Sequence, residues 1–510
     1  MSYSRYNTTT ANKTTIRTPK DYSPVTGICT VCIDQCPGPC EIGRAAVIGP
    51  EVLYPTERAT SQAASEKDYP VDFSHLNING RCFGTFGTEP GRLAYSHADL
   101  SCEIGLGPDK IKLKAPYIFP AMAKLNWQGY YGGAALSGVM AVIGEDMPTT
   151  DPEAVIQDGK VVELPRLKQM HDAFYRLSDG YGALFIQANP DDERLQLLEY
   201  AIGTVGFEAV ELKMAQAAKG IQGMGKVPSL EKALQLKQMG YEIHPDPEDP
   251  KVRKTCEDGT AEPFYKIGKL PEWNEDSLKK RVSDLRSLGA KFVALKTGPF
   301  RTADTARFMA MASASGVDLV TIDTAGGGTG NSPIRMMNEW GYPAVYMQSN
   351  LNRICEKMKE RHLPLPAIAI AGGFAFEDQI FKGLALGAPH TGIIGIGRAA
   401  MAAAMVGETA GLQLQGKTAD EIGELAVLKG RFGDAADAIP SGALGVYNFI
   451  QKTNTGLRQL MALCRTYTLN QISNKDLLAL TQEAARITGL PMATDQDWEE
   501  VDEILERASE

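Results

Sequence analysis

The chain has 510 residues and a formal net charge of −10, with 43% hydrophobic and 22% charged residues, as in an ordinary globular protein of about two to four domains. Nucleic acids and anionic membranes require a basic surface, so we expect neither as a partner. No apolar run approaches the roughly 20 residues of a membrane span, and the polar first residues contain no secretory signal. We therefore expect a cytoplasmic protein in which residues 1–25 form a flexible arm.

Four of the nine cysteines lie close together, in the stretch GICTVCIDQCPGPCEIGR. Thiolates at this spacing can converge on one metal centre, and the interleaved prolines let the backbone wrap around it. The compact spacing favours an iron–sulfur cluster, expected to be [4Fe-4S], over a zinc site or thiols without a metal. The predicted ligands are Cys29, Cys32, Cys36 and Cys40.

These cysteines belong to a cysteine-rich iron–sulfur and capping region that we assign to residues 26–110. Cys82 and Cys102 flank a Gly-rich segment of this region, and either could substitute as a cluster ligand. A role as small buried side chains is favoured for both.

From about residue 111 the sequence alternates strand-sized apolar runs with helix-patterned segments, which is typical of a parallel α/β sheet. The clearest examples, 317–333 and 367–398, contain apolar runs that end in glycines. Eight runs occur, the number that closes a (β/α)8 TIM barrel, which we assign to residues 111–415. The predicted strands are 116–120, 139–143, 183–187, 207–213, 291–296, 318–323, 367–371 and 391–396.

The interval between the fourth and fifth predicted strands is too long for a simple crossover. Its Gly- and Pro-rich sequence, from about 214 to 275, predicts an extended active-site loop with a surface excursion. Beyond the barrel, helical patterns predict a C-terminal helical tail over residues 416–510 that packs on the barrel.

Three predicted strands share a register when they are aligned on their first glycine: GFEAVELK, GAKFVALK and GVDLVTID. Apolar residues at the fourth and sixth positions after the glycine should face the helices, because side chains alternate along a strand. The seventh position carries Lys213, Lys296 and Asp323. These three and Glu211 should point inward at the carboxyl-terminal mouth, where barrel active sites lie. Structural ion pairs are the alternative, but two lysines at one register favour a function.

The last two predicted strands end in glycine turns, at Gly372-Gly373 and at Gly395-Ile396-Gly397-Arg398. Amides at these two strand ends form phosphate sites in barrels, and Arg398 would add a charge-assisted bond. A strand-end lysine beside a phosphate site fits flavin mononucleotide (FMN), because positive charge stabilises the reduced ring. A phosphosugar isomerase would show a similar phosphate site, but the nearby cysteines favour a redox cofactor.

Two motifs resemble the FMN-binding synthase domain of the glutamate synthase family. The stretch ELKMAQAAKG, at 211–220, is similar to its E-I-K-x-x-Q-G-A-K-P motif, and GGTGNSP, at 327–333, is similar to its G-G-T-G-A-S-P turn. The resemblance extends from about 111 to 405. It implies an FMN barrel in which reduced flavin delivers hydride to the imine formed from 2-oxoglutarate and ammonia, giving L-glutamate.

The resemblance, together with the strand register, implies three sets of site residues. Lys213 or Lys296 would orient the oxo-acid and stabilise charge, and Glu211 would carry a proton. The catalytic set is Glu211, Lys213, Lys296 and Asp323. The cofactor-binding set is Gly144, Glu145, Gln187, Lys296, Gly327, Gly328, Thr329, Gly372, Gly373, Gly395, Gly397 and Arg398. The substrate-binding set is Gln216, Lys219 and Ser332.

Three departures from the family pattern bear on the partners. No glutaminase domain precedes the barrel, so we expect free ammonia or an ammonia-supplying subunit. The clustered cysteines precede the barrel instead of following it, as in short, stand-alone members of the family. The sequence GIQGMG at 220–225 replaces a P-G-E-G-G loop that meets the substrate, which leaves the identity of the oxo-acid open.

We expect ferredoxin or an NAD(P)H-oxidising subunit as the electron donor, and a homo-oligomer as the assembly. The chain has no second Gly-rich dinucleotide fingerprint of its own. Two alternative functions remain at this stage. One is a flavin oxidoreductase acting on a different oxo-acid, imine or amine, and the other is an electron-transfer subunit without turnover.

Overall fold

The computed structural model describes residues 69–89, 91–122, 126–215, 220–221, 223–328, 332–413 and 430–509, and residues 46, 65 and 67 singly. The predicted arm, 1–25, lies outside these ranges. So do seven predicted site residues, namely Cys29, Cys32, Cys36, Cys40, Gln216, Lys219 and Thr329.

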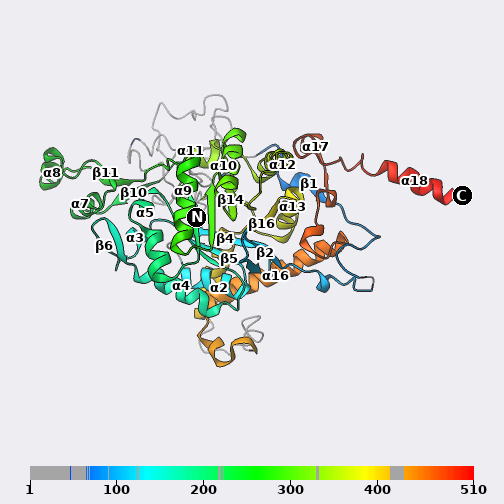
Figure 1. Cartoon of the computed structure of the whole chain (residues 1–510), viewed down its shortest axis with the longest axis horizontal. Helices are drawn as coiled ribbons and strands as arrows, with labels where there is room; N and C mark the ends of the chain where they lie inside the picture. The colour runs from blue at the N-terminus through cyan, green and yellow to red at the C-terminus, as the bar shows by residue number, and fades with distance from the viewer. Residues whose placement is uncertain are drawn as a thin grey trace, which may run out of the picture.

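Eight parallel strands form a closed barrel, and each strand pairs with the barrel strands that come before and after it along the chain (Figure 1). The last strand closes on the first through the pairing of Ile394 with Tyr117. The first and last residues of every predicted strand lie within two residues of those of an observed strand, so the (β/α)8 TIM barrel is confirmed. The strands are β4 (Tyr117–Met122), β5 (Met140–Ile143), β8 (Leu184–Ala188), β9 (Ala209–Lys213), β13 (Phe292–Thr297), β14 (Leu319–Asp323), β15 (Ala367–Ala371) and β16 (Thr391–Gly395).

Helices connect the strands and cover the outside of the barrel (Figure 1). Among the described helices none is long and apolar enough to cross a membrane. The longer covering helices are α2 (Trp127–Ser137), α4 (Pro165–Leu177), α9 (Glu275–Leu288), α10 (Thr302–Ser315), α12 (Ala344–Glu360), α13 (Glu377–Gly387) and α14 (Arg398–Gln413), and the four-residue α6 (Leu197–Tyr200) lies between β8 and β9. Shorter helices are α3 (Met147–Thr150), α5 (Pro190–Arg194) and α11 (Ile334–Glu339), and β6 (Val155–Gln157) pairs with β7 (Lys160–Glu163).

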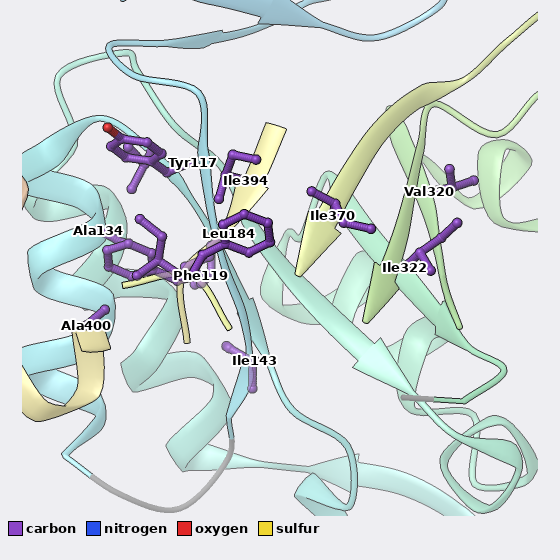
Figure 2. Close-up of a cluster of buried hydrophobic side chains, with 14 of the residues drawn as sticks. Tyr117, Phe119, Ala134, Ile143, Leu184, Val320, Ile322, Ile370, Ile394 and Ala400 are labelled. Atoms are coloured by element: carbon purple, nitrogen blue, oxygen red, sulfur yellow. The ribbon is translucent and has the colours of Figure 1, made fainter. Parts of the chain in front are cut away.

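Because successive side chains of a strand point to opposite faces, the apolar residues form two separate clusters, one outside the barrel wall and one inside it. The outer cluster lies between the strands and the helices, and Figure 2 shows part of it, with Ala134 of α2 beside Phe119 of β4. The residues predicted to face the helices belong to this outer cluster, as expected: Val210, Leu212, Val293, Leu295, Val320 and Ile322. The inner cluster, which includes Phe185 and Phe292, fills the barrel.

A hairpin closes the amino-terminal end of the barrel. Strands β2 (Cys102–Ile104) and β3 (Ile111–Leu113) pair antiparallel, and Ile104, Ile111 and Leu113 join the inner cluster. The amide of Leu106 donates to the Asp318 carboxylate at the start of β14, over 3.0 Å. The hairpin therefore forms a floor at the end of the barrel opposite the carboxyl ends of its strands.

The segment predicted as an extended loop contains a small α/β subdomain. Its strands are too short for an alternation of apolar and polar residues to be recognised in the sequence. The secondary structure of this segment was therefore not predicted. It consists of β10 (Met224–Val227), α7 (Leu230–Gln238), β11 (Glu242–His244), α8 (Pro250–Glu257) and β12 (Phe264–Ile267). The sheet is antiparallel with β12 in the centre, and the subdomain projects to one side of the barrel (Figure 1).

The regions on either side of the barrel in sequence are joined in space. Strand β1 (Leu76–Ile78) pairs antiparallel with β17 (Leu477–Ala479). The tail contains α16 (Ser441–Leu463), α17 (Gln482–Thr488) and α18 (Trp498–Ser509). Helix α18 has no buried residue and extends away from the body of the molecule (Figure 1).

Glycines allow α16 to pack closely against α2 and α14. A Cβ added at Gly133 of α2 would lie 2.3 Å from the Cβ of Val446 on α16. A Cβ at Gly445 of α16 would lie 2.5 Å from the carbonyl oxygen of Ala403 on α14. Helix backbones approach this closely only where one of the two facing residues has no side chain.

We expect Gly133→Ala to lower the free energy of unfolding by about 2 kcal/mol, because the added methyl overpacks the α2–α16 interface. Denaturant unfolding followed by circular dichroism measures this change. Gly203→Ala is the matched control, since no atom lies within 4 Å of a Cβ built there. Equal effects of the two substitutions would contradict the packing interpretation.

Candidate active site

A cavity of about 640 Å³ lies at the mouth of the barrel, at the carboxyl ends of β4 and β13 to β16. Residues from five segments that are far apart in the sequence meet there. The predicted site residues that line it are Lys296, Asp323, Gly327, Gly328, Gly372, Gly373, Gly395, Gly397 and Arg398.

Glycine is required where the loops after β14 and β15 meet. Gly372 has a φ of +101°, and a Cβ there would lie 2.6 Å from the carbonyl oxygen of Thr324. The Thr324 hydroxyl donates to the carbonyl oxygens of Ala371 (2.9 Å) and Gly372 (3.1 Å), which fixes the two loops together. The cavity wall is therefore bare backbone, which a polar ligand can approach closely.

The start of α14 completes this side of the cavity. Arg398 is the first residue of the helix, and its guanidinium donates to the carbonyl oxygen of Gly326 over 3.1 Å. A helix amino terminus and a guanidinium both favour an anion. The atoms nearest to a Cβ at Gly397 would belong to Met122 and Pro120, at 3.8 Å, and both of those residues line the cavity. The glycine therefore leaves space that a larger side chain would fill.

A second group of predicted residues forms a buried polar cluster on the neighbouring strands β5, β8 and β9. The Gln187 amide donates to the Glu211 carboxylate over 2.5 Å, and both side chains are about 1% exposed. Lys213 forms an ion pair with Glu145, which follows β5. None of these residues, nor Gly144, lines the cavity described above.

The barrel register brings the two groups together. Lys213 and Lys296 are direct neighbours in the pairing of β9 with β13. The Lys296 ammonium lies 3.7 Å from the Asp323 carboxylate, so each of the two lysines faces an acidic side chain. The predicted catalytic residues Glu211, Lys213, Lys296 and Asp323 are thus contiguous at the mouth.

Burial raises the pKa of Glu211 above its ordinary value. The ammonium of Lys296, the amide of Gln187 and the ammonium of Lys213 oppose this increase, and the Asp323 carboxylate adds to it. Glu211 therefore holds its proton to a higher pH than an exposed glutamate, which suits a group that donates a proton.

Two buried polar atoms at the mouth lack a hydrogen-bond partner within the described ranges. They are Oε1 of Gln187 and Oγ1 of Thr321. Buried polar groups are nearly always satisfied, so such atoms indicate a polar ligand or water. Ser332, the third predicted substrate residue, is completely buried just before α11.

The apolar wall of the cavity was not predicted from the sequence. Pro120, Ala121 and Met122 supply one part, since β4 continues two residues beyond its predicted end. Met401 and Met405 supply another part, at the four-residue spacing that places them on one face of α14. That spacing is a signal that could have been found in the sequence.

An acidic pair beside the buried cluster was also not predicted. The backbone amide of Asp146 donates to the Asp192 carboxylate over 2.9 Å, and the Asp146 carboxylate accepts from the Asn189 amide over 3.2 Å. Burial, with the nearby Asp146 charge, raises the pKa of Asp192 well above its ordinary value. Asp192 lies in α5 within the sequence NPDDER, whose Asn-Pro start and capping box predict a helix amino terminus but not a contact with Asp146.

In the described part of the chain no group of three or more His, Cys, Asp or Glu side chains is placed to hold a metal ion. Burial raises the pKa of the Cys102 thiol to about 12. Cys82 is exposed, so the expectation that it is a small buried side chain was wrong. It lies in a loop that follows β1, where too few apolar side chains gather to cover it.

Residues 263–407 match the family model described as the conserved region in glutamate synthase. The predicted resemblance to that family is confirmed over this part of the chain. No curated protein matches the chain.

Among solved structures, the flavin-binding domain of baker's yeast flavocytochrome b2 is 13% identical, with a TM-score of 0.47, over 83% of this chain and 80% of that chain. A mandelate oxidase variant is 14% identical, with a TM-score of 0.42, over 79% of this chain and 86% of that chain. Similarity at this level concerns the barrel fold alone. The family match supports the broader prediction of an FMN-dependent oxidoreductase.

We expect Glu211→Gln to become more stable than the unsubstituted protein as the pH rises. A carboxyl whose folded pKa is raised contributes stability that is lost between its unfolded and its folded pKa, and glutamine removes that loss. Urea unfolding of both proteins at several pH values from 5 to 8 measures the difference.

The matched control is Glu208→Gln, at a carboxylate that is 52% exposed just before β9. It should leave the pH dependence of unfolding as it is. A difference between Glu211→Gln and the unsubstituted protein that stayed constant across this range would contradict the burial argument.

Proposed function

We propose that the protein is an FMN- and iron–sulfur-dependent oxidoreductase that forms L-glutamate from 2-oxoglutarate and ammonia. The observation that carries this proposal is the meeting of the glycine-walled cavity and the Lys213–Lys296 strand pair at one barrel mouth. The match of residues 263–407 to the conserved region in glutamate synthase supports it.

The residues of the cavity fit FMN. The volume of the cavity is in the usual range for a cofactor site, roughly 300 to 1,000 Å³. Bare backbone at Gly372 and Gly373, with Arg398, would hold the phosphate, while Pro120 and Met122 offer apolar surface to a flat ring. Lys296 would place positive charge beside the ring. When bound, FMN would supply a hydride, that is, two electrons and one proton.

The chain's own residues would position the substrate and supply the remaining proton. Conversion of 2-oxoglutarate and ammonium to glutamate and water consumes two electrons and two protons. Lys213 and Lys296 are placed to bind the carboxylate and to stabilise charge, each held in place by an acidic partner. Glu211, whose raised pKa favours the protonated form, would donate the second proton.

A different oxo-acid, imine or amine is the second candidate substrate. Lys213 and Lys296 each already face a carboxylate, so these two lysines bring little net positive charge to the mouth. A dicarboxylate needs more compensation than a monocarboxylate. This balance is the observation behind the second candidate, a substrate with one carboxylate.

The electron supply is also part of the proposal. Cys29, Cys32, Cys36 and Cys40 would hold the cluster that passes electrons to FMN. Reduced ferredoxin or an NAD(P)H-oxidising subunit would be the donor. A separate subunit or free ammonia would supply nitrogen, and the site would work in the cytoplasm within a homo-oligomer.

The protein purified without oxygen should contain FMN and iron, and should form glutamate from 2-oxoglutarate and ammonium with a chemical reductant. Absorbance, iron analysis and amino-acid analysis measure these outcomes. Flavin-containing protein that reduces pyruvate imine but not 2-oxoglutarate imine would favour the second candidate. Colourless, metal-free protein, or rapid NADPH oxidation by the isolated chain, would refute the proposal.

Gly397→Leu should abolish FMN binding while leaving the fold intact, because the side chain would enter the cavity from a position with free space. Flavin content after reconstitution, with circular dichroism as a check on folding, measures this. Gly392→Leu is the matched control at the other end of β16, where no atom lies within 4 Å of a Cβ. Retention of FMN by the Gly397 variant would place the cofactor elsewhere.

A further inference from the structure

Two consecutive residues at the end of β5 connect the barrel mouth with the inserted subdomain. Glu145 forms the ion pair with Lys213 inside the mouth. Asp146, the next residue, forms an ion pair with Lys266 of β12, with 3.0 Å between the Lys266 ammonium and the Asp146 carboxylate. The subdomain therefore contacts Asp146, which is adjacent to Glu145, the ion-pair partner of the predicted catalytic residue Lys213.

The backbone of Lys266 is held rigidly. It lies in the central strand of the three-stranded sheet, paired with Gly225 of β10 on one side and with Ile243 of β11 on the other. Its side chain is 16% exposed and lies over the ring of Tyr241, with 4.8 Å between the ammonium and the ring centroid. A cation over an aromatic ring is further restricted in position.

The subdomain is itself fixed to the barrel. The guanidinium of Arg194, in α5, lies over the Tyr241 ring at 5.1 Å and donates to the carbonyl oxygen of Met239. Arg194 is also paired with Asp191 of its own helix, over 3.2 Å. The ammonium of Lys266 is thus presented to Asp146 from a surface that cannot easily shift.

Asp146 has an uncommon backbone conformation that its contacts must maintain. Its φ of +67° lies in the left-handed region, which costs energy for a residue with a side chain. Asn189, Asp192 and Lys266 all bond to it. The direction in which the chain leaves β5, and hence the position of Glu145, depends on this set of bonds.

We propose that Lys266 is a positioning residue for the reaction at the barrel mouth. By holding Asp146, it fixes the adjacent Glu145, and Glu145 in turn fixes the ammonium of Lys213 where it meets the substrate carboxylate. Lys266 itself does not touch the substrate. This role for Lys213 rests on the proposed function, whereas the mechanical link from Lys266 to Lys213 does not.

The inserted subdomain is thereby a part of the active site rather than a surface addition. Its central strand places the ammonium of Lys266 at the edge of the mouth. Removal of that charge should make the position of Lys213 less restricted without disturbing the glycine-walled cavity. Flavin binding and substrate binding should therefore respond differently to the same substitution.

The first test measures the reactivity of individual lysines, which needs no turnover. The full-length protein is labelled with acetic anhydride, and mass spectrometry follows the modification of Lys213 and Lys296 over time. In Lys266→Met, Lys213 should react about tenfold faster than in the unsubstituted protein, because its restraint is lost. Lys296 should react at an unchanged rate, as an internal reference.

The matched control is Lys237→Met in the same subdomain, which removes the exposed ion pairs of Lys237 with Asp246 and Glu248. It should leave the labelling of Lys213 unchanged. Lys266→Arg, which keeps the charge, should restore slow labelling. Unchanged labelling of Lys213 in Lys266→Met, or equal acceleration in the Lys237 variant, would overturn the proposal.

The second test measures the kinetics of oxo-acid reduction with a chemical reductant. Lys266→Met should raise the KM for the oxo-acid about tenfold while FMN content and kcat stay within about threefold. A fall in kcat with an unchanged KM would overturn the positioning role. If the unsubstituted protein reduces no oxo-acid, the proposed function fails, and the labelling rates still decide whether Lys266 positions Lys213.

Discussion

Two ammonium groups lie side by side on adjacent strands inside the barrel, each facing a carboxylate: Lys213 with Glu145 and Lys296 with Asp323. Moving these charges out of water is costly, and removing one partner of a buried pair typically costs about 3 to 5 kcal/mol. Apolar side chains of similar size could fill the same space without that cost. These buried ion pairs are therefore present although they do not favour stability, as expected where charge is used in binding or chemistry.

The mouth is divided into two halves with different chemistry. On one half, the loops after β14 and β15 meet as bare backbone, and α14 adds its amino terminus. On the other half, β8 supplies the Gln187 amide, while β9 and the residues after β5 supply ionisable side chains. A cofactor and a substrate can thus be held on separate surfaces and still meet, because the lysines of β9 and β13 lie at the boundary.

The barrel was predictable because each strand is a short, mainly apolar segment and glycine turns mark several of the strand ends. The inward direction of Glu211, Lys213 and Lys296 followed from alternation alone, and the structure places all three in the buried interior. The subdomain and its Lys266 contact were not predictable, since strands of three or four residues show no clear period. The Asp146–Asp192 contact joins residues 46 positions apart through a helix of five residues, which leaves no pattern in the sequence.

The pairing of β1 with β17 has a consequence for the order in which the molecule is completed. Strand β1 is translated before the barrel, but its partner β17 is translated some 400 residues later, after the barrel. The eight barrel strands are all synthesised in that interval. The segment around β1 must therefore wait beside a nascent barrel, and its pairing with β17 can form only after all eight barrel strands have been made.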